Sequence, residues 1–289
     1  MSSNRADRAR DPLGAQLHNE RGIQLAERGW REEAIREFRR AVELDPGYPA
    51  PRDNLAALLA ESGEFLESLR EYLAAIDLDP DHPEGYLRLA DFLALRSESA
   101  AEEMYGRARE LDPGCPEAHS GLALLLHEEG RLSEARAQYE AALALDGDDP
   151  ELRRAYARLL YDLGELNAAV AELKRVVAHQ PADAEAMSDL GIAYASKGFR
   201  DLAADAWRRA LVLDPDRLED QYNLAALYAL GGDDDPALDA LGRALSLNRD
   251  RVLEWLRDDG KFDKLRQDPR FADMVDSRHA STLRSAEND

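Results

Sequence analysis

The side chains with the clearest chemical potential are Cys115 and His119, because a thiol and an imidazole four residues apart can form a nucleophile–base pair. Cys115 lies between Gly114 and Pro116 in a predicted turn, so we interpret it as a surface thiol. His119 and His127 are two helical turns apart, too far to share a metal, and a lone cysteine gives no zinc pair. No glycine-rich phosphate or dinucleotide motif occurs. We therefore expect no catalytic centre, metal or cofactor.

Two acid-rich turns, at 146–150 and 232–236, resemble calcium-binding loops only in composition. Neither has the twelve-residue ligand spacing or the closing glutamate of a calcium-binding EF-hand. Each ends in Asp-Pro, which is typical of a helix start, where the aspartate caps free backbone N–H groups. We predict that Asp149 and Asp235 are helix caps.

The charge balance narrows the class of partner. The chain has 59 acidic and 37 basic residues, for a formal net charge of -22. This excess of acids argues against nucleic acid and against an anionic membrane, and it favours basic or neutral partners. We see no apolar signal segment and no run of apolar residues long enough to span a bilayer, so we expect a cytoplasmic protein.

A repeat of about 34 residues organises most of the chain. The string Leu-Asp-Pro occurs at 44–46, 78–80, 111–113 and 213–215, and the longest gap holds two further periods. When the units are aligned at this period, three positions recur, which we call columns. The first column holds small residues, the second holds large apolar residues four positions later, and the third holds small residues again. These columns are Ala34, Ser68, Ala101, Ala135, Ala169, Ala203 and Ala237; Phe38, Tyr72, Tyr105, Tyr139, Leu173, Trp207 and Leu241; and Ala41, Ala75, Ala108, Ala142, Val176, Ala210 and Ala244.

Each period contains two stretches of helical periodicity separated, in six of the seven units, by a glycine turn. Spacings of three, four and seven place the column residues on one helix face, and small residues allow two antiparallel helices to approach closely. A hairpin of this kind buries its apolar face only by stacking on the next one. The third unit has Arg96-Ser97-Glu98-Ser99 in place of glycine, which predicts a tightened or frayed turn.

This pattern resembles the tetratricopeptide repeat. The resemblance implies an all-α fold: a right-handed α-α superhelix of about seven hairpins over 12–250. Apolar residues from Leu253 to Met274 suit C-terminal capping helices over 251–279, and the stretch from Phe262 to Phe271 is similar to segments that close bacterial arrays. We predict disordered tails at 1–11 and 280–289.

The same resemblance implies a concave groove lined by the first helix of each unit. Carried over by register, the partner-binding candidates are Asn19, Ile23, Asn54, Leu87, Arg88, Asp91, Leu124, His127, Arg154, Arg158, Tyr161, Ile192, Tyr222 and Asn223. The asparagines are too few for a backbone-binding ladder, and the lysines of a chaperone-binding clamp are absent from the first units.

Two features of this groove have competing interpretations. Acids dominate it, which favours a basic peptide; yet five glutamates fall in first turns, where they stabilise the helix dipole regardless of any partner. These are Glu84, Glu117, Glu151, Glu185 and Glu219. Arg154 and Arg158, four residues apart beside Tyr161, suit a partner's exposed carboxylate; alternatively, acids such as Glu117 or Asp189 neutralise them.

We therefore predict a non-enzymatic scaffold or adaptor that binds a protein or peptide partner in the groove, as a monomer or weak homo-oligomer. The alternatives are a self-assembling structural protein and a regulatory subunit of an enzyme complex. A free-standing enzyme is disfavoured, because repeats and cap account for nearly every residue.

Overall fold

The computed structural model describes residues 10–276, so almost all of both predicted tails lies outside the described range. Arg10 and Asp11 are the exceptions. Oδ1 of Asp11 accepts a hydrogen bond from the backbone N–H of Gly14 at 2.9 Å, and the N–H of Asp11 donates to the carbonyl of Leu44 at 3.0 Å. Asp11 thus caps the first helix, which starts at Pro12.

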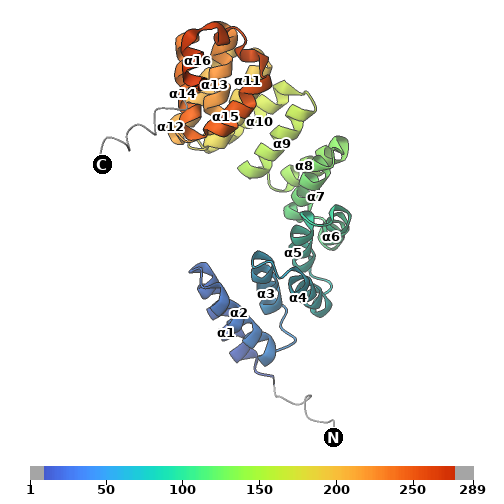
Figure 1. Ribbon diagram of the computed structural model, residues 1–289. Coiled ribbons are helices and arrows are strands. Elements are labelled where there is room, and N and C mark those ends of the chain that lie inside the picture. Colours follow the sequence, from blue (N-terminus) through green and yellow to red (C-terminus); the bar gives the residue numbers. More distant parts are fainter. Residues whose placement is uncertain (1–9, 277–289) are drawn as a thin grey trace, which may run out of the picture. The chain divides into compact units, whose positions relative to one another are not determined.

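The described residues form helices joined by short turns (Figure 1). Consecutive helices pair as hairpins and give seven repeats, followed by a C-terminal cap. The hairpin helices are α1 (Pro12–Glu27), α2 (Arg31–Leu44), α3 (Ala50–Glu61), α4 (Phe65–Leu78), α5 (Pro83–Ala94), α6 (Glu98–Leu111), α7 (Pro116–Glu128), α8 (Leu132–Leu145), α9 (Pro150–Asp162), α10 (Leu166–His179), α11 (Ala184–Ser196), α12 (Arg200–Leu213), α13 (Leu218–Gly231) and α14 (Asp234–Leu247). The cap contains α15 (Arg249–Asp258), η1 (Gly260–Phe262), η2 (Leu265–Gln267) and α16 (Pro269–Asp276).

The three predicted columns form the core of the hairpins. Every member of the first small column has no exposed surface, from Ala34 to Ala237, and the large apolar column is buried throughout. Ser68 replaces alanine in this column, and its hydroxyl donates to the carbonyl of Ala56 at 2.8 Å, which satisfies the buried polar group. The periodicity therefore identified the packed faces correctly, and burial of these apolar side chains stabilises each pair.

Where a glycine of one helix faces an aromatic ring of its partner helix, the pair leaves no room for a Cβ. A Cβ added at Gly191 would lie 2.5 Å from Nε1 of Trp207, and one at Gly22 would lie 2.5 Å from the ring of Phe38. Large side chains of the second helix thus occupy space left by small residues of the first, as interdigitated packing requires. The alternation of small and large residues sets the spacing of the hairpin.

The turn between the two helices of a hairpin has one backbone conformation where it contains glycine and another where it does not. In the turn of the fifth repeat, Gly164 has a φ of 75°, a left-handed conformation that other residues adopt at a cost. In the third repeat, the N–H groups of Arg96 and Ser97 both donate to the carbonyl of Leu93 at 2.8 Å, with no positive φ. The turn that the sequence predicted to be tightened or frayed is a tight, hydrogen-bonded one.

One of the two predicted aspartate caps is confirmed and the other is wrong. Oδ1 of Asp149 accepts the N–H of Glu151 at 2.9 Å and that of Leu152 at 3.3 Å. The other helix, α14, begins at Asp234, so Asp235 lies inside its first turn and its carboxylate pairs with Arg270 of the cap at 2.7 Å. The five glutamates expected in first turns all lie there: Glu84, Glu117, Glu151, Glu185 and Glu219.

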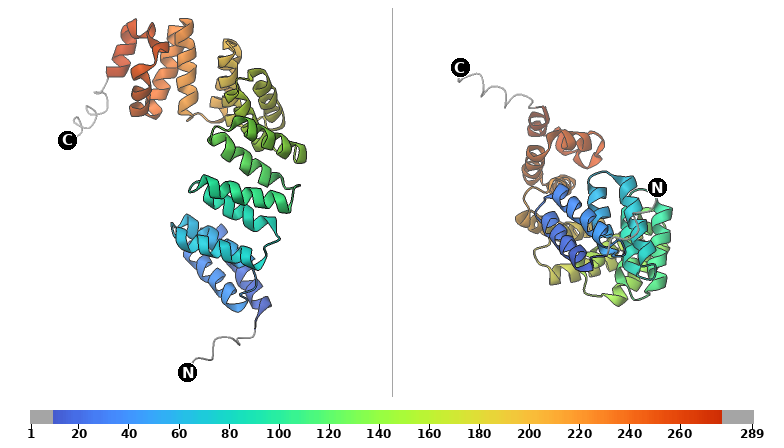
Figure 2. Two further views of the ribbon diagram at one scale, coloured as in Figure 1. Left: turned by 90° about the vertical axis from the view of Figure 1, so that its right-hand side faces the viewer. Right: turned by 90° about the horizontal axis from the view of Figure 1, so that it is seen from below.

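The chain divides into two compact units, 1–152 and 153–289, so the boundary falls within α9. In the first unit, hairpins stack in chain order, and further views in Figure 2 show their helices side by side. In the second unit, one apolar core runs from α9 through α14 into the cap, where Val252, Phe262 and Leu265 are fully or almost fully buried. No helix among the described residues has the length and apolar character needed to cross a membrane.

Candidate partner-binding surfaces

The first helices of the second unit carry two hollows that meet at Ile192. The α9–α11 hollow, of about 230 Å³, lies among residues of the fifth and sixth repeats; the α11–α13 hollow, of about 330 Å³, continues from the sixth repeat to the seventh and the cap. We call the two together the α9–α13 groove. The lining residues are Ala157, Arg158, Tyr161, Asp162, Leu173, Asp189, Ile192 and Ala193 for the first, and Ile192, Ala195, Ser196, Trp207, Asn223, Ala226, Leu227, Leu230 and Lys261 for the second.

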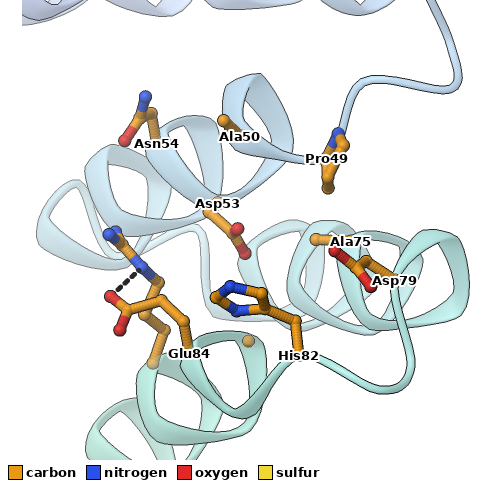
Figure 3. A pocket seen from close by; sticks show the side chains of 10 residues that line it. Pro49, Ala50, Asp53, Asn54, Ala75, Asp79, His82 and Glu84 are labelled. Carbon is orange, nitrogen blue, oxygen red and sulfur yellow. Dashed lines mark hydrogen bonds and ion pairs between the residues drawn. The ribbon is translucent and has the colours of Figure 1, made fainter.

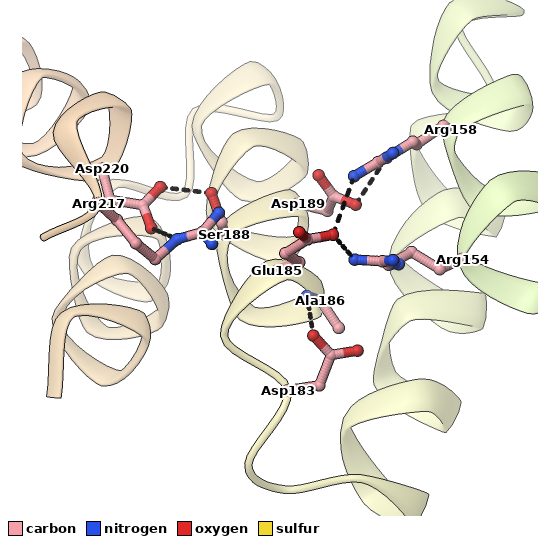
Figure 4. A network of polar contacts seen from close by, with 9 residues as sticks. All are labelled: Arg154, Arg158, Asp183, Glu185, Ala186, Ser188, Asp189, Arg217 and Asp220. Atoms are coloured by element: carbon pink, nitrogen blue, oxygen red, sulfur yellow. Dashed lines mark hydrogen bonds and ion pairs between the residues drawn. The ribbon is translucent and has the colours of Figure 1, made fainter. Parts of the chain in front are cut away.

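The arginine pair predicted to grip a partner's carboxylate is already engaged within the protein (Figure 4). Nε of Arg158 lies 2.9 Å from Oδ2 of Asp189, and Arg154 pairs with Glu185. Both acids stand on the first helix of the following repeat, so these pairs tie α9 to α11. The alternative in which Asp189 neutralises the arginines describes the geometry of Arg158.

A second polar layer, which the sequence did not reveal, joins α11 to α13. The hydroxyl of Ser188 donates to Oδ1 of Asp220, and Nε of Arg217 donates to Oδ2 of the same carboxylate at 2.7 Å. Asp220 is completely buried, and burial raises the pKa of its carboxyl although both partners oppose the rise. Burial likewise raises the pKa of Asp189 against the effect of Arg158. Asp189 and Asp220 therefore connect successive repeats to one another.

Tyr222 is not available to a partner, contrary to its predicted role. Its side chain is 7% exposed, and its ring lies against Trp255 and Phe262 of the cap. Tyr222 lies on the first helix of its repeat, α13, but the chain's own C-terminal segment covers its ring. Its neighbour Asn223 does line the α11–α13 hollow.

Several first-unit candidates also serve the fold. Nδ2 of Asn54 donates to Oδ1 of Asn19 at 3.0 Å, and Asn19 is buried between repeats. Leu87 is only 8% exposed and belongs to the core. Asp91 accepts a hydrogen bond from the hydroxyl of Tyr105 at 2.6 Å.

The remaining first-unit candidates differ in exposure. Ile23 and Leu124 are exposed. His127 is half-buried, with its ring edge-on to that of Tyr139. Arg88 lies at a hollow between repeats two and three.

This third hollow, which we call the α3–α5 hollow, measures about 230 Å³ (Figure 3). It combines residues of α3, the C-terminal end of α4, the α4–α5 turn and the first turns of α5. Burial raises the pKa of Asp53 to about 6, with Arg88 opposing the rise, Glu84 adding to it and His82 opposing it. Asp53, Asn54, Glu84 and Arg88 of its lining are residues that the repeat register places in the groove. The lining residues are Pro49, Ala50, Asp53, Asn54, Ala75, Asp79, His82, Glu84, Gly85 and Arg88.

The thiol expected at the surface is buried. Cys115 is 8% exposed, and its Sγ donates to Oε2 of Glu117 at 3.2 Å, because the residue stands at the N-cap of α7 and turns inward. Burial raises the pKa of the Cys115 thiol. Nδ1 of His119 instead lies 2.8 Å from Oε1 of Gln138. Between residues 10 and 276, no group of three His, Cys, Asp or Glu side chains is arranged to hold a metal ion.

Stacked two-helix hairpins with shared first-helix hollows define a helical-repeat protein. Family models described as tetratricopeptide repeat match residues 15–48, 98–159 and 126–190. The matched segments are tetratricopeptide repeats, as the resemblance predicted. No curated protein matches the sequence.

Solved structures share this fold at low sequence identity. YrrB, described as a tetratricopeptide protein with an unusual peptide-binding site, is 24% identical with a TM-score of 0.54, covering 64% of this chain and 97% of that one. PilF of Pseudomonas aeruginosa is 22% identical with a TM-score of 0.63, covering 72% and 96%. A chain of the APC/C hetero-tetramer Cut9–Hcn1 is 19% identical with a TM-score of 0.64, covering 75% and 44%. At these identities the likeness shows the helical-repeat fold alone.

Proposed function

We propose that this protein is a non-enzymatic scaffold that holds an extended segment of a protein partner in the α9–α13 groove. The observation that carries the proposal is the meeting of two hollows at Ile192. A segment lying across them would cross three successive repeats without leaving a concave surface. Tetratricopeptide arrays are general interaction scaffolds, and the fold neighbour YrrB is described as having a peptide-binding site.

The chemistry of the groove suits a peptide with small or medium apolar side chains. Its floor includes Ala157, Ala193 and Ala226, where alanine leaves room for such side chains. At the rim, Asn223 offers an amide able to both donate to and accept from a peptide backbone. The hydroxyls of Tyr161 and Ser196 lie 2.8 Å apart and bridge α9 to α11 beside the floor.

The rim carries both signs of charge, so it selects orientation more than net charge. Arg158 and Lys261 stand at the two hollows, and Asp162 and Asp189 stand at the first. The two cations already face carboxylates, since Arg158 lies beside Asp189 and Nζ of Lys261 lies 3.3 Å from Oδ2 of Asp259. A partner's carboxylate would have to displace one of these pairs, whereas an apolar segment leaves them intact.

The experiment is selection of short random peptides displayed on phage against the full chain, followed by titration of the enriched peptides. Ile192→Glu places a charge where the hollows meet and is expected to weaken binding by about tenfold or more. Leu202→Glu is the matched control, because Leu202 is a 48% exposed aliphatic residue on the second helix of the same hairpin. Equal affinity of both variants and wild type, with circular dichroism showing intact helices, would remove the groove from the proposal.

A further inference from the structure

The α3–α5 hollow lies in the first unit and has no part in the α9–α13 groove. Its polar lining comes from separate segments: Asp53 from α3, Asp79 and His82 from the α4–α5 turn, and Glu84 and Arg88 from α5. Figure 3 shows the carboxylates of Asp53 and Asp79 turned toward the ring of His82. Its floor is made of small residues, including Ala50, Ala75 and Gly85, which leave space for a ligand side chain.

The charges around this hollow are not balanced within the protein. Three carboxylates line it, and Glu84 is engaged by Nε of Arg88 at 3.1 Å. Oδ1 of Asp53 has no exposed surface and no hydrogen-bond partner, although a buried carboxylate oxygen normally accepts at least one. The three carboxylates of the lining outnumber its single guanidinium, that of Arg88. A cation entering it would be attracted by this excess of negative charge.

We infer that the α3–α5 hollow receives the cationic side chain, arginine or lysine, of a protein partner. An ammonium or guanidinium is small enough for a space of about 230 Å³, and its aliphatic stem would pack on the alanine floor. A guanidinium has the further advantage that it can donate hydrogen bonds to two carboxylates at once. The carboxylates of Asp53 and Asp79 lie on two sides of the hollow. The metal-ion alternative is disfavoured, because the described residues offer no metal-binding arrangement here.

The inference rests on the proposed function in taking the cation to be part of a protein partner. The strongly acidic composition, with a net charge of -22, would speed the encounter with a basic partner. The hollow would add to this general attraction a single position where one basic side chain is recognised. The inference thus specifies a basic side chain in the partner, which the mixed charges of the α9–α13 groove do not specify.

The test uses the full chain and three small probes. N-acetyl-arginine N-methylamide carries the guanidinium, and N-acetyl-citrulline N-methylamide replaces it with a neutral group of the same shape. The lysine counterpart carries an ammonium, which distinguishes it from the guanidinium. Two-dimensional NMR of the labelled protein reports binding as shifts of backbone amides. We expect the arginine or lysine probe to shift amides of 49–54 and 79–88, and the citrulline probe not to shift them.

Two variants with opposite effects make the test specific. Asp53→Asn removes the unpartnered carboxylate and is expected to weaken the cationic probe about fivefold or more. Arg88→Met removes the competing cation and is expected to strengthen it about threefold. Asp77→Asn is the matched control, because Asp77 is an exposed acid of α4 outside the lining and its loss changes the net charge equally.

Equal shifts from the arginine and citrulline probes, or an Asp53→Asn variant that binds like Asp77→Asn, would overturn the inference. Binding of the cationic probe that Arg88→Met does not strengthen would also count against it, because removing a competing guanidinium from the hollow should raise the affinity. Since the probes contain no groove-binding peptide, their failure would leave the α9–α13 groove standing, and failure of the groove would not affect these titrations.

Discussion

The hydroxyl of Tyr222 donates a hydrogen bond to Oδ2 of Asp259 at 2.9 Å and so joins the last repeat to the C-terminal cap. The centroid of its ring lies 5.0 Å from that of Trp255 and 5.3 Å from that of Phe262. The cap thereby covers the first-helix face that would otherwise end the array in an unpaired apolar surface. Terminal repeats generally need a cap of this kind.

We expect Tyr222→Phe to loosen the cap without disturbing the ring cluster. The change keeps the aromatic contacts and removes one hydrogen bond to a carboxylate, for a loss of about 1 kcal/mol. Hydrogen exchange at amides of 249–276 should accelerate, while exchange in the first unit stays as in wild type. Unchanged exchange in the cap would show that the Tyr222–Asp259 bond does not hold it.

The same contact makes the cap sensitive to acid. Burial opposes the shift, but the backbone N–H of Lys261 and the hydroxyl of Tyr222 together hold the pKa of Asp259 below its ordinary value of 3.8. A depressed carboxyl pKa adds stability that is present above the unfolded value and is lost as pH falls through the folded value. Protection factors in the cap, which correct for the pH dependence of intrinsic amide exchange, should therefore fall below about pH 4. In Tyr222→Phe this fall should be smaller, because the pKa of Asp259 is then less depressed.

The Arg158–Asp189 pair should stabilise the protein because its two charges are opposite. Arg158→Glu would place a third acid beside Glu185 and Asp189, and we expect a loss of about 0.5 to 1 kcal/mol, because Arg158 is half exposed. Adding Asp189→Arg restores opposite charges and should recover part of that loss in urea unfolding. A double variant less stable than the sum of both single changes would contradict the ion-pair interpretation.

Two glycines with different backbone conformations should respond oppositely to alanine. Gly164 has a φ of 75° in a turn, so Gly164→Ala should destabilise the protein by about 1 kcal/mol. Gly106 lies inside α6 with nothing within 4 Å of an added Cβ, so Gly106→Ala should stabilise it by about 0.5 to 1 kcal/mol. Thermal unfolding of the two variants checks the contrast, and a shift of the same sign in both would refute it.

Asp53 should make the first unit more stable in mild acid than at neutral pH, as far as this one group contributes. Burial raises its pKa from 3.8 to about 6, so the folded chain holds a proton that the unfolded chain releases between these values. The cost of ionising Asp53 is complete above the folded pKa and disappears as pH falls toward the unfolded one.

The variant that tests this cost is Asp53→Asn. It should gain about 1 kcal/mol at neutral pH, discounted for the remaining solvent exposure, and the gain should shrink as pH falls through 6. Asp77→Asn, an exposed change of equal charge, should show no such pH dependence in urea titrations. A gain in Asp53→Asn that is constant with pH would exclude ionisation as its cause.

The hairpin architecture could be predicted from the sequence because it depends on local patterns repeated many times. The column from Ala34 to Ala237 marks helix faces by spacing alone, and every member is buried as expected. The first-turn glutamates and the Asp149 cap follow from short-range backbone chemistry in the same way. Such signals involve residues within one or two helical turns of each other, so they can be recognised in the sequence alone.

The candidate site was only partly predictable. Tyr161, Ile192 and Asn223, which were chosen by register, line the first-helix hollows, and Arg154 and Arg158 pair with acids of the next repeat. Register could not show that Tyr222 lies under the cap. Nor could it show that Cys115 turns inward or that Asp53 is left with an unpartnered oxygen.

What the sequence by itself determined, then, is the period of the repeat and which helix faces pack. What only the tertiary structure decided is which polar side chains are already engaged across repeats, as Arg158 is with Asp189, 31 residues away. Repetition makes every repeat offer similar side chains to its neighbours, so the sequence alone does not say which of them pair. The choice depends on side-chain positions across the repeat interface, where burial and hydrogen-bond geometry decide which charges stay open to a partner.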